Sequence, residues 1–445
     1  MITTVQWLNH PIIGNLSLDF RKANGEPYNA IVLAGENGTG KTTILDTLCT
    51  FLNRGSFSPF DHLQYRINGV DYTITRGDHP EFGFHIRKNE NEGIEKKISS
   101  NKNNNANTID SDTEDIRHYG CSYSKARSGF KTEKVTNITN QQLDDTRYED
   151  DAKDDFTSIK RLLIDIDTQD NSQWMDETRK GSGLSFEAFR LISKKYRFEQ
   201  AFNNFFEKMI FKRIDNTQAD EKKILFEKGG TEITIDSLST GEKQIVFRGA
   251  HLLKNSKSIT GEVVLIDEPE LSLHPKWQMK ILQYYRALFT NAGVQETQMI
   301  FATHSEYVLR AALENSTDVL VVVLKEDNGA IVAQKITAPF ALPTVTFAET
   351  NYLAFDVVSK DYHIELYGYL QNKTGNLTVK NCDNYIAAHS DYDATKHNKP
   401  YIHGSTTYQT LPTYIRNAID HPDAHYTYTE NELRLSIELL VKLCK

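Results

Sequence analysis

The residues with the clearest chemical signature form a glycine-rich run, GENGTGKTT, at positions 35–43. An apolar stretch at 30–34 precedes the run and a helical pattern at 41–52 follows it, so the backbone N–H groups of the turn can point at phosphate oxygens. We expect Lys41 to place its ammonium on the β- and γ-phosphates and Thr42 to bind Mg²⁺ through its hydroxyl. The predicted nucleotide-binding residues are Gly35, Glu36, Asn37, Gly38, Thr39, Gly40, Lys41, Thr42 and Thr43. The run therefore predicts a site for ATP with Mg²⁺.

Two adjacent carboxylates follow a second apolar strand, predicted over 262–266. Asp267 is expected to hold the metal ion, directly or through water. Glu268 is expected to orient and polarise the water that attacks the γ-phosphate. A single Asp-Glu pair often does no more than close a strand, but together with a phosphate loop this pair predicts hydrolysis.

Two further motifs could contact phosphate. His304 follows the apolar strand 298–302, where an imidazole can reach the γ-phosphate of a nucleotide held at the first loop. Ser239 and Gly241 open a helix predicted to continue to residue 253, and free N–H groups with the helix dipole favour an anion there. Taken singly, these would be an ordinary histidine and an ordinary helix cap.

These four motifs, in this order, resemble the ABC ATPase family, especially its SMC-, RecF- and OLD-like heads. The resemblance implies an α/β fold, an ABC ATPase head with a mixed sheet and a helical lid insertion. It also implies that Ser239 and Gly241 contact the γ-phosphate bound by another protomer, in a head-to-head dimer or higher homo-oligomer. Residues 268–275, EPELSLHP, resemble the extension that follows the paired carboxylates in this branch. Thr240 and Glu242 stand where Gly and Gln are commoner, and Gln64 is one candidate for the Q-loop glutamine.

Two more segments narrow the resemblance, GCSYSKARSGFK at 120–131 and FAETNYLAFD at 347–356. They are similar to bacterial antiphage ATPases of the Septu PtuA group, including those associated with retrons, with the AriA ATPase of the PARIS system a close rival. Membership would imply an oligomeric ATPase that senses infection and regulates a partner nuclease of HNH or TOPRIM type. Nucleic acid would be reached through that partner. A RecF- or SMC-like DNA-repair ATPase is the alternative, but the sequence shows no sustained heptads.

A different class of function is indicated by the run RNAIDH at 416–421. It fits the Arg-Asn-x-x-x-His pattern of HEPN ribonucleases. Arg416 would then bind the scissile phosphate and His421 would act as acid or base, making the chain an ATP-gated ribonuclease. The alternative is two cationic side chains placed favourably near a helix C-terminus.

The remaining pattern predicts two parts. Residues 1–345 are expected to form the ATPase head, with a mobile, Asn- and Lys-rich insertion at about 88–115 and a helical subdomain at about 155–215. Residues 346–445 are expected to form a mostly helical C-terminal domain. An Asn-Gly pair, Asn68-Gly69, predicts a hairpin between strands at 65–67 and 70–75.

Bulk composition is that of a globular protein. The 445 residues are 39% hydrophobic and 25% charged, with a formal net charge of −9 that argues against a chain coating nucleic acid non-specifically. The four cysteines are widely spaced, which suggests neither a zinc site nor a disulfide framework. The sequence shows no signal peptide and no apolar run long enough for a bilayer, so a cytoplasmic location without membrane contact is expected.

Overall fold

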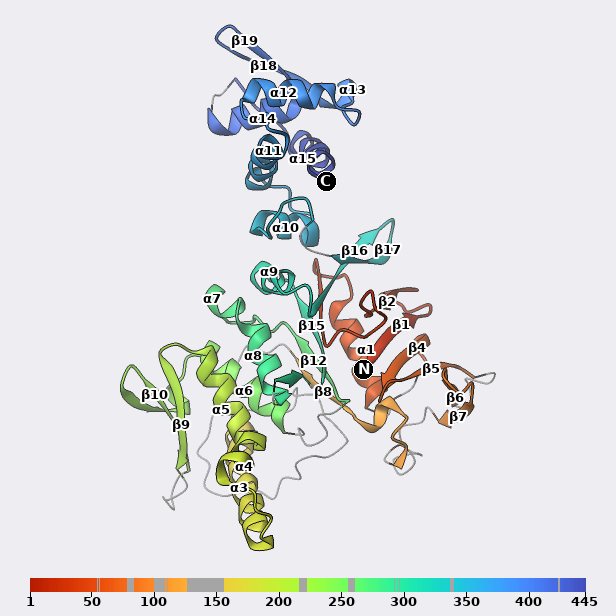
Figure 1. Ribbon diagram of the computed structural model, residues 1–445, viewed down its shortest axis with the longest axis vertical. Helices are drawn as coiled ribbons and strands as arrows, with labels where there is room; N and C mark the ends of the chain where they lie inside the picture. Colours follow the sequence, from red (N-terminus) through yellow and green to blue (C-terminus); the bar gives the residue numbers. More distant parts are fainter. Residues whose placement is uncertain are drawn as a thin grey trace. The chain divides into compact units, whose positions relative to one another are not determined.

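The computed structural model describes the chain in two compact units, Met1–Gln334 and Lys335–Lys445 (Figure 1). The described residues are 1–53, 55, 57–77, 84–99, 109, 111–125, 156–215, 222–254, 261–291, 293–295, 297–336, 340–422 and 425–445. Part of the family segment at 120–131 therefore lies outside them. The head was expected to end at residue 345, and the first unit ends at Gln334.

The first unit is built around a mainly parallel sheet with the strand order β17-β16-β3-β15-β12-β8. The strands are β3 (Ala30–Gly35), β8 (Cys121–Ser124), β12 (Val263–Asp267), β15 (Gln298–Thr303), β16 (Val319–Asp327) and β17 (Ala330–Ile336). Strands β16, β3, β15, β12 and β8 run parallel to one another. Their carboxyl ends consequently lie along one edge, where ligands of α/β sheets bind.

An antiparallel sheet covers one face of the parallel sheet. Its order is β2-β1-β4-β5-β6-β7, with β1 (Ile2–Trp7), β2 (Ser17–Asp19), β4 (Phe60–Ile67), β5 (Val70–Arg76), β6 (Phe84–Asn89) and β7 (Glu95–Ser99). Helix α1 (Lys41–Leu52) lies in the core between the sheets, where alternate residues of the parallel strands, such as Ile31 and Leu265, are completely buried. The helix that follows the phosphate loop is thus held by apolar contacts on both sides.

The segment 88–115, expected to be a mobile insertion, partly belongs to this antiparallel sheet. Residues 95–99 form β7, which pairs with β6. Arg87 of β6 bonds Asp112 at 3.0 Å and Glu114 at 2.6 Å, which ties the following segment to the sheet. A short 3-10 helix, Ile116–His118, then leads into β8. Residues 100–108 and 110 are outside the described residues.

Helices lie on the other side of the parallel sheet, some against its strands and others packed on those helices (Figure 1). They are α3 (Phe156–Lys180), α4 (Phe186–Ile192), α5 (Lys194–Phe205), α6 (Thr240–Leu253), α7 (Pro275–Gln278), α8 (Ile281–Leu288) and α9 (Glu306–Glu314). A small antiparallel sheet of β9 (Met209–Asp215), β10 (Lys223–Lys228) and β11 (Thr231–Thr234) continues from α5, and Ile235–Ser237 is a 3-10 turn before α6. A two-stranded ribbon joins β13 (Thr290–Asn291) and β14 (Val294–Gln295). The helical pattern expected over 155–215 thus ends at Phe205, and 209–215 is a strand.

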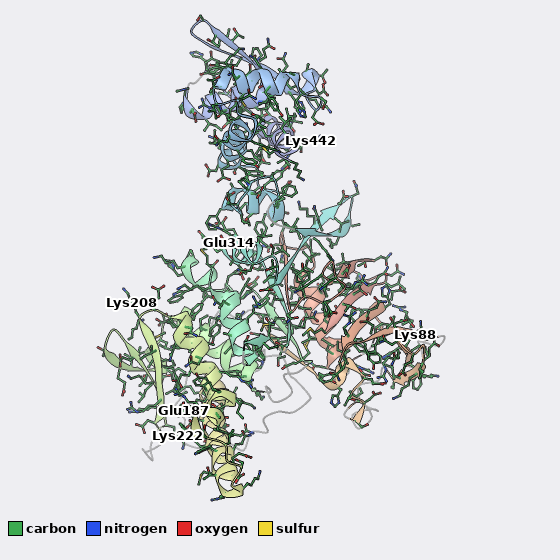
Figure 2. The ribbon with its side chains drawn as sticks, viewed as in Figure 1. Lys88, Glu187, Lys208, Lys222, Glu314 and Lys442 are labelled. Atoms are coloured by element: carbon green, nitrogen blue, oxygen red, sulfur yellow. The ribbon has the colours of Figure 1, made fainter. Side chains whose placement is uncertain are left out.

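The second unit is mostly helical, as its composition predicts. Its elements are α10 (Phe347–Phe355), α11 (Lys360–Thr374), α12 (Val379–Ala388), α13 (Ala394–His397), β18 (Asn398–His403), β19 (Thr406–Thr410), α14 (Leu411–Asp420) and α15 (Glu430–Cys444). Its core includes Tyr362, Leu366 and Ile437, all fully buried. Charged residues outside the two cores, such as Glu187 and Glu314, point to solvent (Figure 2).

The free energy of unfolding is expected to fall at mildly acidic pH because of His363. This imidazole is completely buried, and its Nε2 lies 2.9 Å from Ser436 Oγ. Burial lowers its pKa to about 3, against about 6.5 in an unfolded chain. The unfolded state therefore binds the extra proton between these values, and His363 alone should lower stability by about 2 kcal/mol from pH 7.5 to pH 5.0. Urea unfolding at both pH values checks this, since His363→Gln should reduce the difference; an unchanged difference would contradict it.

Candidate active site

The phosphate loop connects β3 to α1 at the carboxyl edge of the parallel sheet. Gly35 has φ 143° and Gly40 has φ 84°, conformations that residues with a Cβ rarely adopt. A Cβ on Gly35 would also meet the Leu324 carbonyl oxygen at 2.3 Å, and one on Gly40 would meet the Ile13 side chain at 2.2 Å. Both positions therefore require glycine for the fold of the loop.

Lys41 is buried beneath this loop. Its Nζ donates to the carbonyl oxygens of Gly35 and Glu36, each at 2.8 Å. Burial lowers its pKa, against the opposing effect of nearby carboxylates, first Asp267 and then Glu268. The ammonium is thus held at the loop by weak neutral acceptors, which phosphate oxygens could replace with stronger charged contacts.

Thr42 and Asp267 meet across the edge of the sheet. Thr42 Oγ1 donates to Asp267 Oδ2 at 3.0 Å, although the two residues are 225 positions apart. Burial raises the pKa of Asp267 to about 6, with Glu268 adding to the rise and the Thr42 hydrogen bond opposing it. Two oxygens about 3 Å apart match neighbouring ligands of an octahedral Mg²⁺ with bonds of about 2.1 Å. A hydroxyl and a carboxylate are also oxygen donors of the kind that Mg²⁺ prefers, so these residues fit the metal.

Glu268 lies beside His304 at the same edge. Its Oε1 is 3.6 Å from His304 Nδ1, and the imidazole is equally far from Glu270 Oε1. Glu268 has φ 46°, an unusual conformation for a non-glycine residue and a common mark of functional positions. Its backbone N–H is bonded to the Ala302 carbonyl at 2.9 Å. The carboxylate remains one-third exposed, so a water molecule can reach it.

Two supporting residues, Glu270 and Arg248, are not among the predicted site residues, although Glu270 lies within the run EPELSLHP. Glu270, 5% exposed, accepts hydrogen bonds from Thr303 Oγ1 at 2.8 Å and from the backbone N–H of His304 at 3.1 Å, which positions the histidine. Burial raises the pKa of Glu270, against these hydrogen bonds. Arg248, 2% exposed, donates from α6 to the carbonyls of Asp267 at 2.9 Å, Glu268 at 3.0 Å and Lys125 at 3.0 Å.

Arg248→Met is expected to destabilise the protein by about 3–5 kcal/mol and to reduce ATP turnover. Three carbonyl oxygens would lose their donor, and the backbone of the paired carboxylates would lose its link to α6. Denaturant unfolding with ATPase assays checks both effects. Arg310→Met is a matched control, because Arg310 lies on helix α9 and pairs with Glu314 near the surface. Equal stability of the two variants would contradict the role given to Arg248.

Ser239 and Gly241 have other neighbours. Ser239 caps α6 in a reciprocal capping box with Glu242. A Cβ on Gly241 would meet the Ser272 carbonyl oxygen at 2.7 Å, so the start of α6 is packed against the segment after the paired carboxylates. Charge interactions, hydrogen bonds and an ion pair therefore link Lys41, Thr42, Asp267, Glu268 and His304 at one edge, whereas the Ser239 side chain is bonded to Glu242 of its own helix.

The remaining candidates lie elsewhere. Gln64 bonds Thr4 and Thr73 at 2.9 and 3.3 Å within the antiparallel sheet, a structural role that does not suit a Q-loop glutamine. In the second unit, Arg416 is paired with Asp420 at 2.8 Å and bonded to Asn417 at 2.9 Å. Its charge is thus neutralised within its own helix, which disfavours binding of a scissile phosphate. His421 is the C-cap of that helix.

The described residues also bear on disulfides, metal-binding groups and long apolar helices. All four cysteines are free and buried. No group of three or more His, Cys, Asp or Glu side chains among the described residues is arranged to hold a metal ion. Within the same residues, no helix combines the length and apolar content needed to cross a bilayer.

Curated relatives of the chain include two bacterial proteins. The chain is 25% identical to the Retron Vc95 probable ATPase of Vibrio cholerae serotype O1 biovar El Tor over 372 residues, covering 66% of this chain and 70% of that protein. It is 24% identical to Septu protein PtuA of Bacillus thuringiensis over 343 residues, covering 72% and 76%.

Solved structures similar to the chain include SMC heads. The SmcHead bound to the C-winged helix domain of ScpA has a TM-score of 0.43 and 13% identity, covering 77% of this chain and 99% of that one. The SMC head domain from Thermotoga maritima has a TM-score of 0.39 and 14% identity, covering 76% and 99%.

The family match covers the motifs described above. The family described as an AAA domain of the AbiEii toxin, Type IV TA system, matches residues 30–310, which include the phosphate loop, the start of α6, the paired carboxylates and His304. The chain therefore belongs to the AbiEii-type AAA domain family and is an ATPase.

Proposed function

We propose that the chain is the ATP-hydrolysing subunit of an antiphage defence complex, and that ATP joins two copies of its head. The observation that carries the proposal is which motifs are bonded to one another. Thr42 of the phosphate loop is bonded to Asp267, whereas Ser239 is bonded to Glu242 in the capping box of α6. A second copy that presents its Ser239 and Gly241 would complete the site. The retron and Septu relatives support the defence role.

The chemistry of the site follows from its side chains. Lys41 and the loop N–H groups bind the phosphates, and Thr42 with Asp267 would hold Mg²⁺, which neutralises charge on the β- and γ-phosphates when bound. Glu268 orients the attacking water and accepts its proton. His304, whose backbone N–H is held by Glu270 and whose ring lies beside Glu268, would contact the γ-phosphate. Head association would then depend on ATP, and hydrolysis would end it.

ATP-dependent association is tested by light scattering after size-exclusion chromatography. Glu268→Gln with ATP and Mg²⁺ is expected to shift to a dimer or higher oligomer, because bound ATP is not consumed. Adding Ser239→Arg should prevent the shift, because the larger cationic side chain would occupy the space of the second copy's nucleotide. Ser182→Arg is the matched control, since Ser182 is exposed in the loop after α3. An ATP-independent mass, or an unaffected Ser239→Arg variant, would contradict the shared site.

We further propose that the assembled heads restrain or release a partner nuclease of HNH or TOPRIM type, which contacts nucleic acid. The support is the relationship to Septu PtuA. Co-expression with the products of neighbouring genes, followed by co-purification, tests this partnership. We expect a nuclease to co-purify and to cleave nucleic acid in an ATP-dependent manner. Antiphage protection by this chain alone would contradict the need for a partner.

A further inference from the structure

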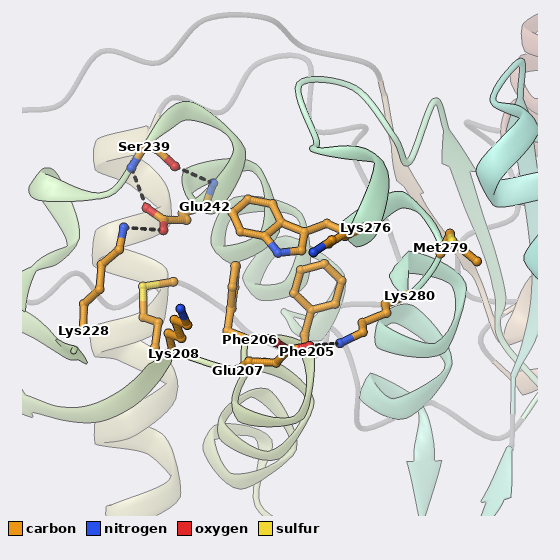
Figure 3. Close-up of a pocket in the computed structure, with 12 residues that line it drawn as sticks. Phe205, Phe206, Glu207, Lys208, Lys228, Ser239, Glu242, Lys276, Met279 and Lys280 are labelled. Carbon is orange, nitrogen blue, oxygen red and sulfur yellow. Dashed lines mark hydrogen bonds and ion pairs between the residues drawn. The ribbon is translucent and has the colours of Figure 1, made fainter. Parts of the chain in front are cut away.

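A large cavity lies beside the start of α6, in the first unit. Its volume is about 770 Å³, within the range of small-molecule sites. It is formed where α5 runs into β9, at the end of β10, at the first turn of α6 and along α7 (Figure 3). The lining residues are Phe205, Phe206, Glu207, Lys208, Met209, Lys228, Ser239, Glu242, Lys276, Trp277, Met279 and Lys280. Neither the phosphate loop nor the paired carboxylates line it.

Aromatic rings form one part of the lining. The ring centroids of Phe206 and Trp277 are 5.0 Å apart, and these two rings are nearly perpendicular. The ring centroids of Phe205 and Phe206 are 4.9 Å apart. Met209 and Met279 add polarizable thioethers. Planar faces and edges of this kind favour a flat aromatic group.

Lysines form the rim. Lys228 is paired with Glu242 at 2.7 Å, and Lys280 is paired with Glu207 at 2.7 Å, as the dashed lines of Figure 3 show. Lys208 and Lys276 are exposed and line the same cavity. Four lysines and two glutamates give the lining a formal charge of +2. A polyvalent anion of modest size would balance this charge.

We propose that this cavity binds a nucleoside phosphate, with the base against Phe206 and Trp277 and the phosphate on Lys208 and Lys276. Each simpler ligand leaves part of the cavity unused. A purely apolar ligand would desolvate the lysines without pairing them, and inorganic phosphate would make no use of the aromatic rings. A base joined to a phosphate matches both, and the volume is ample for a mononucleotide. The cavity is lined by none of the phosphate-loop residues, although Ser239, which the proposed shared site presents to the second copy's nucleotide, belongs to its lining. The proposal does not depend on the defence role.

The cavity is also connected to the ATPase machinery. Glu242, which pairs with Lys228, accepts a hydrogen bond of 2.8 Å from the backbone N–H of Ser239. This hydrogen bond completes the cap of α6. A ligand phosphate that attracted Lys228 would weaken this arrangement. Further along α6, Arg248 holds the carbonyls of Asp267 and Glu268. Helix α6 thus connects the lining of the cavity to the backbone of the paired carboxylates.

Tryptophan fluorescence of the full chain tests the site. The chain has three tryptophans, and only Trp277 lines the cavity. Addition of dTMP without Mg²⁺ is expected to quench the Trp277 signal saturably, because the base stacks near the indole. Thymidine and inorganic phosphate should bind at least about tenfold more weakly, since each lacks half of the recognised group. A 5′-phosphorylated dinucleotide, tested beside dTMP, distinguishes a strand end from a free nucleotide as the source of the ligand.

Variants separate this site from others. Lys208→Glu with Lys276→Glu should abolish saturable quenching, and Phe206→Ala should weaken it about tenfold. Trp277→Phe should remove the signal. Lys396→Glu with Lys442→Glu, both exposed lysines of the second unit, is the charge-matched control and should bind as the unaltered protein does. Lys41→Ala should also retain quenching, which excludes the phosphate loop.

Three results would overturn the proposal. The first is no saturable quenching by dTMP or by the dinucleotide. The second is equal quenching in the Lys208→Glu, Lys276→Glu variant. The third is a Trp277 signal that changes with protein concentration in the absence of nucleotide, which would show that a second copy covers the cavity.

Discussion

Glu268→Gln is expected to lower the rate of ATP hydrolysis by a factor of about 10² to 10⁴ while ATP still binds. The amide keeps the size of the side chain but cannot accept the proton of the attacking water. The contacts that position this residue are made by its backbone, to Ala302 and to Arg248, and do not depend on the carboxylate. The variant is therefore expected to keep the fold of the site and to lose only the rate of ATP hydrolysis.

The measurement compares phosphate release with binding of a labelled ATP. Glu314→Gln is a suitable control, since Glu314 is an exposed carboxylate at the end of α9. Its turnover should equal that of the unaltered protein. Normal turnover in Glu268→Gln would remove Glu268 from its proposed role and leave His304 as the next candidate at this edge.

Local signals in the sequence predicted the elements that carry the motifs. Helix α1 spans Lys41–Leu52, the predicted range, because the glycine loop before it and its apolar face are both local properties. The hairpin at Asn68-Gly69 is confirmed, and both residues have positive φ, 50° and 79°, as a tight turn between twisted strands requires. The apolar runs before the phosphate loop, the paired carboxylates and His304 are all buried strands of one sheet.

What the sequence could not show is which distant segments become neighbours. Strand β8 lies beside β12, about 140 positions away, and no pattern within either strand specifies this pairing. Arg248 is a second example. Its partners are backbone carbonyls, which every residue possesses, so its role leaves no pattern of residue types. Phe205 and Phe206 show another limit of the sequence pattern. Their spacing predicts a core position, and the structure shows that they also line a cavity.

Lys41→Ala is expected to weaken ATP binding about 100-fold or more. A charge-assisted hydrogen bond to a phosphate oxygen contributes about 1.5–3 kcal/mol, and the ammonium is expected to make two of them. The side chain is buried under the loop, held by the carbonyls of Gly35 and Glu36, so no neighbouring cation can take its place without moving the backbone. Lys41→Ala is therefore expected to reduce the affinity for ATP, whereas Glu268→Gln is expected to reduce the rate of ATP hydrolysis.

Isothermal titration calorimetry with ATP and Mg²⁺ separates these two effects. Because burial lowers the pKa of Lys41, the fold holds this charge at an electrostatic cost, and its removal should leave the thermal midpoint similar. Lys243→Ala is the control on another helix, since Lys243 lies in the first turn of α6 outside the loop. Unchanged ATP affinity in Lys41→Ala would count against the phosphate-loop assignment itself, because every other role at this sheet edge depends on a γ-phosphate placed by Lys41.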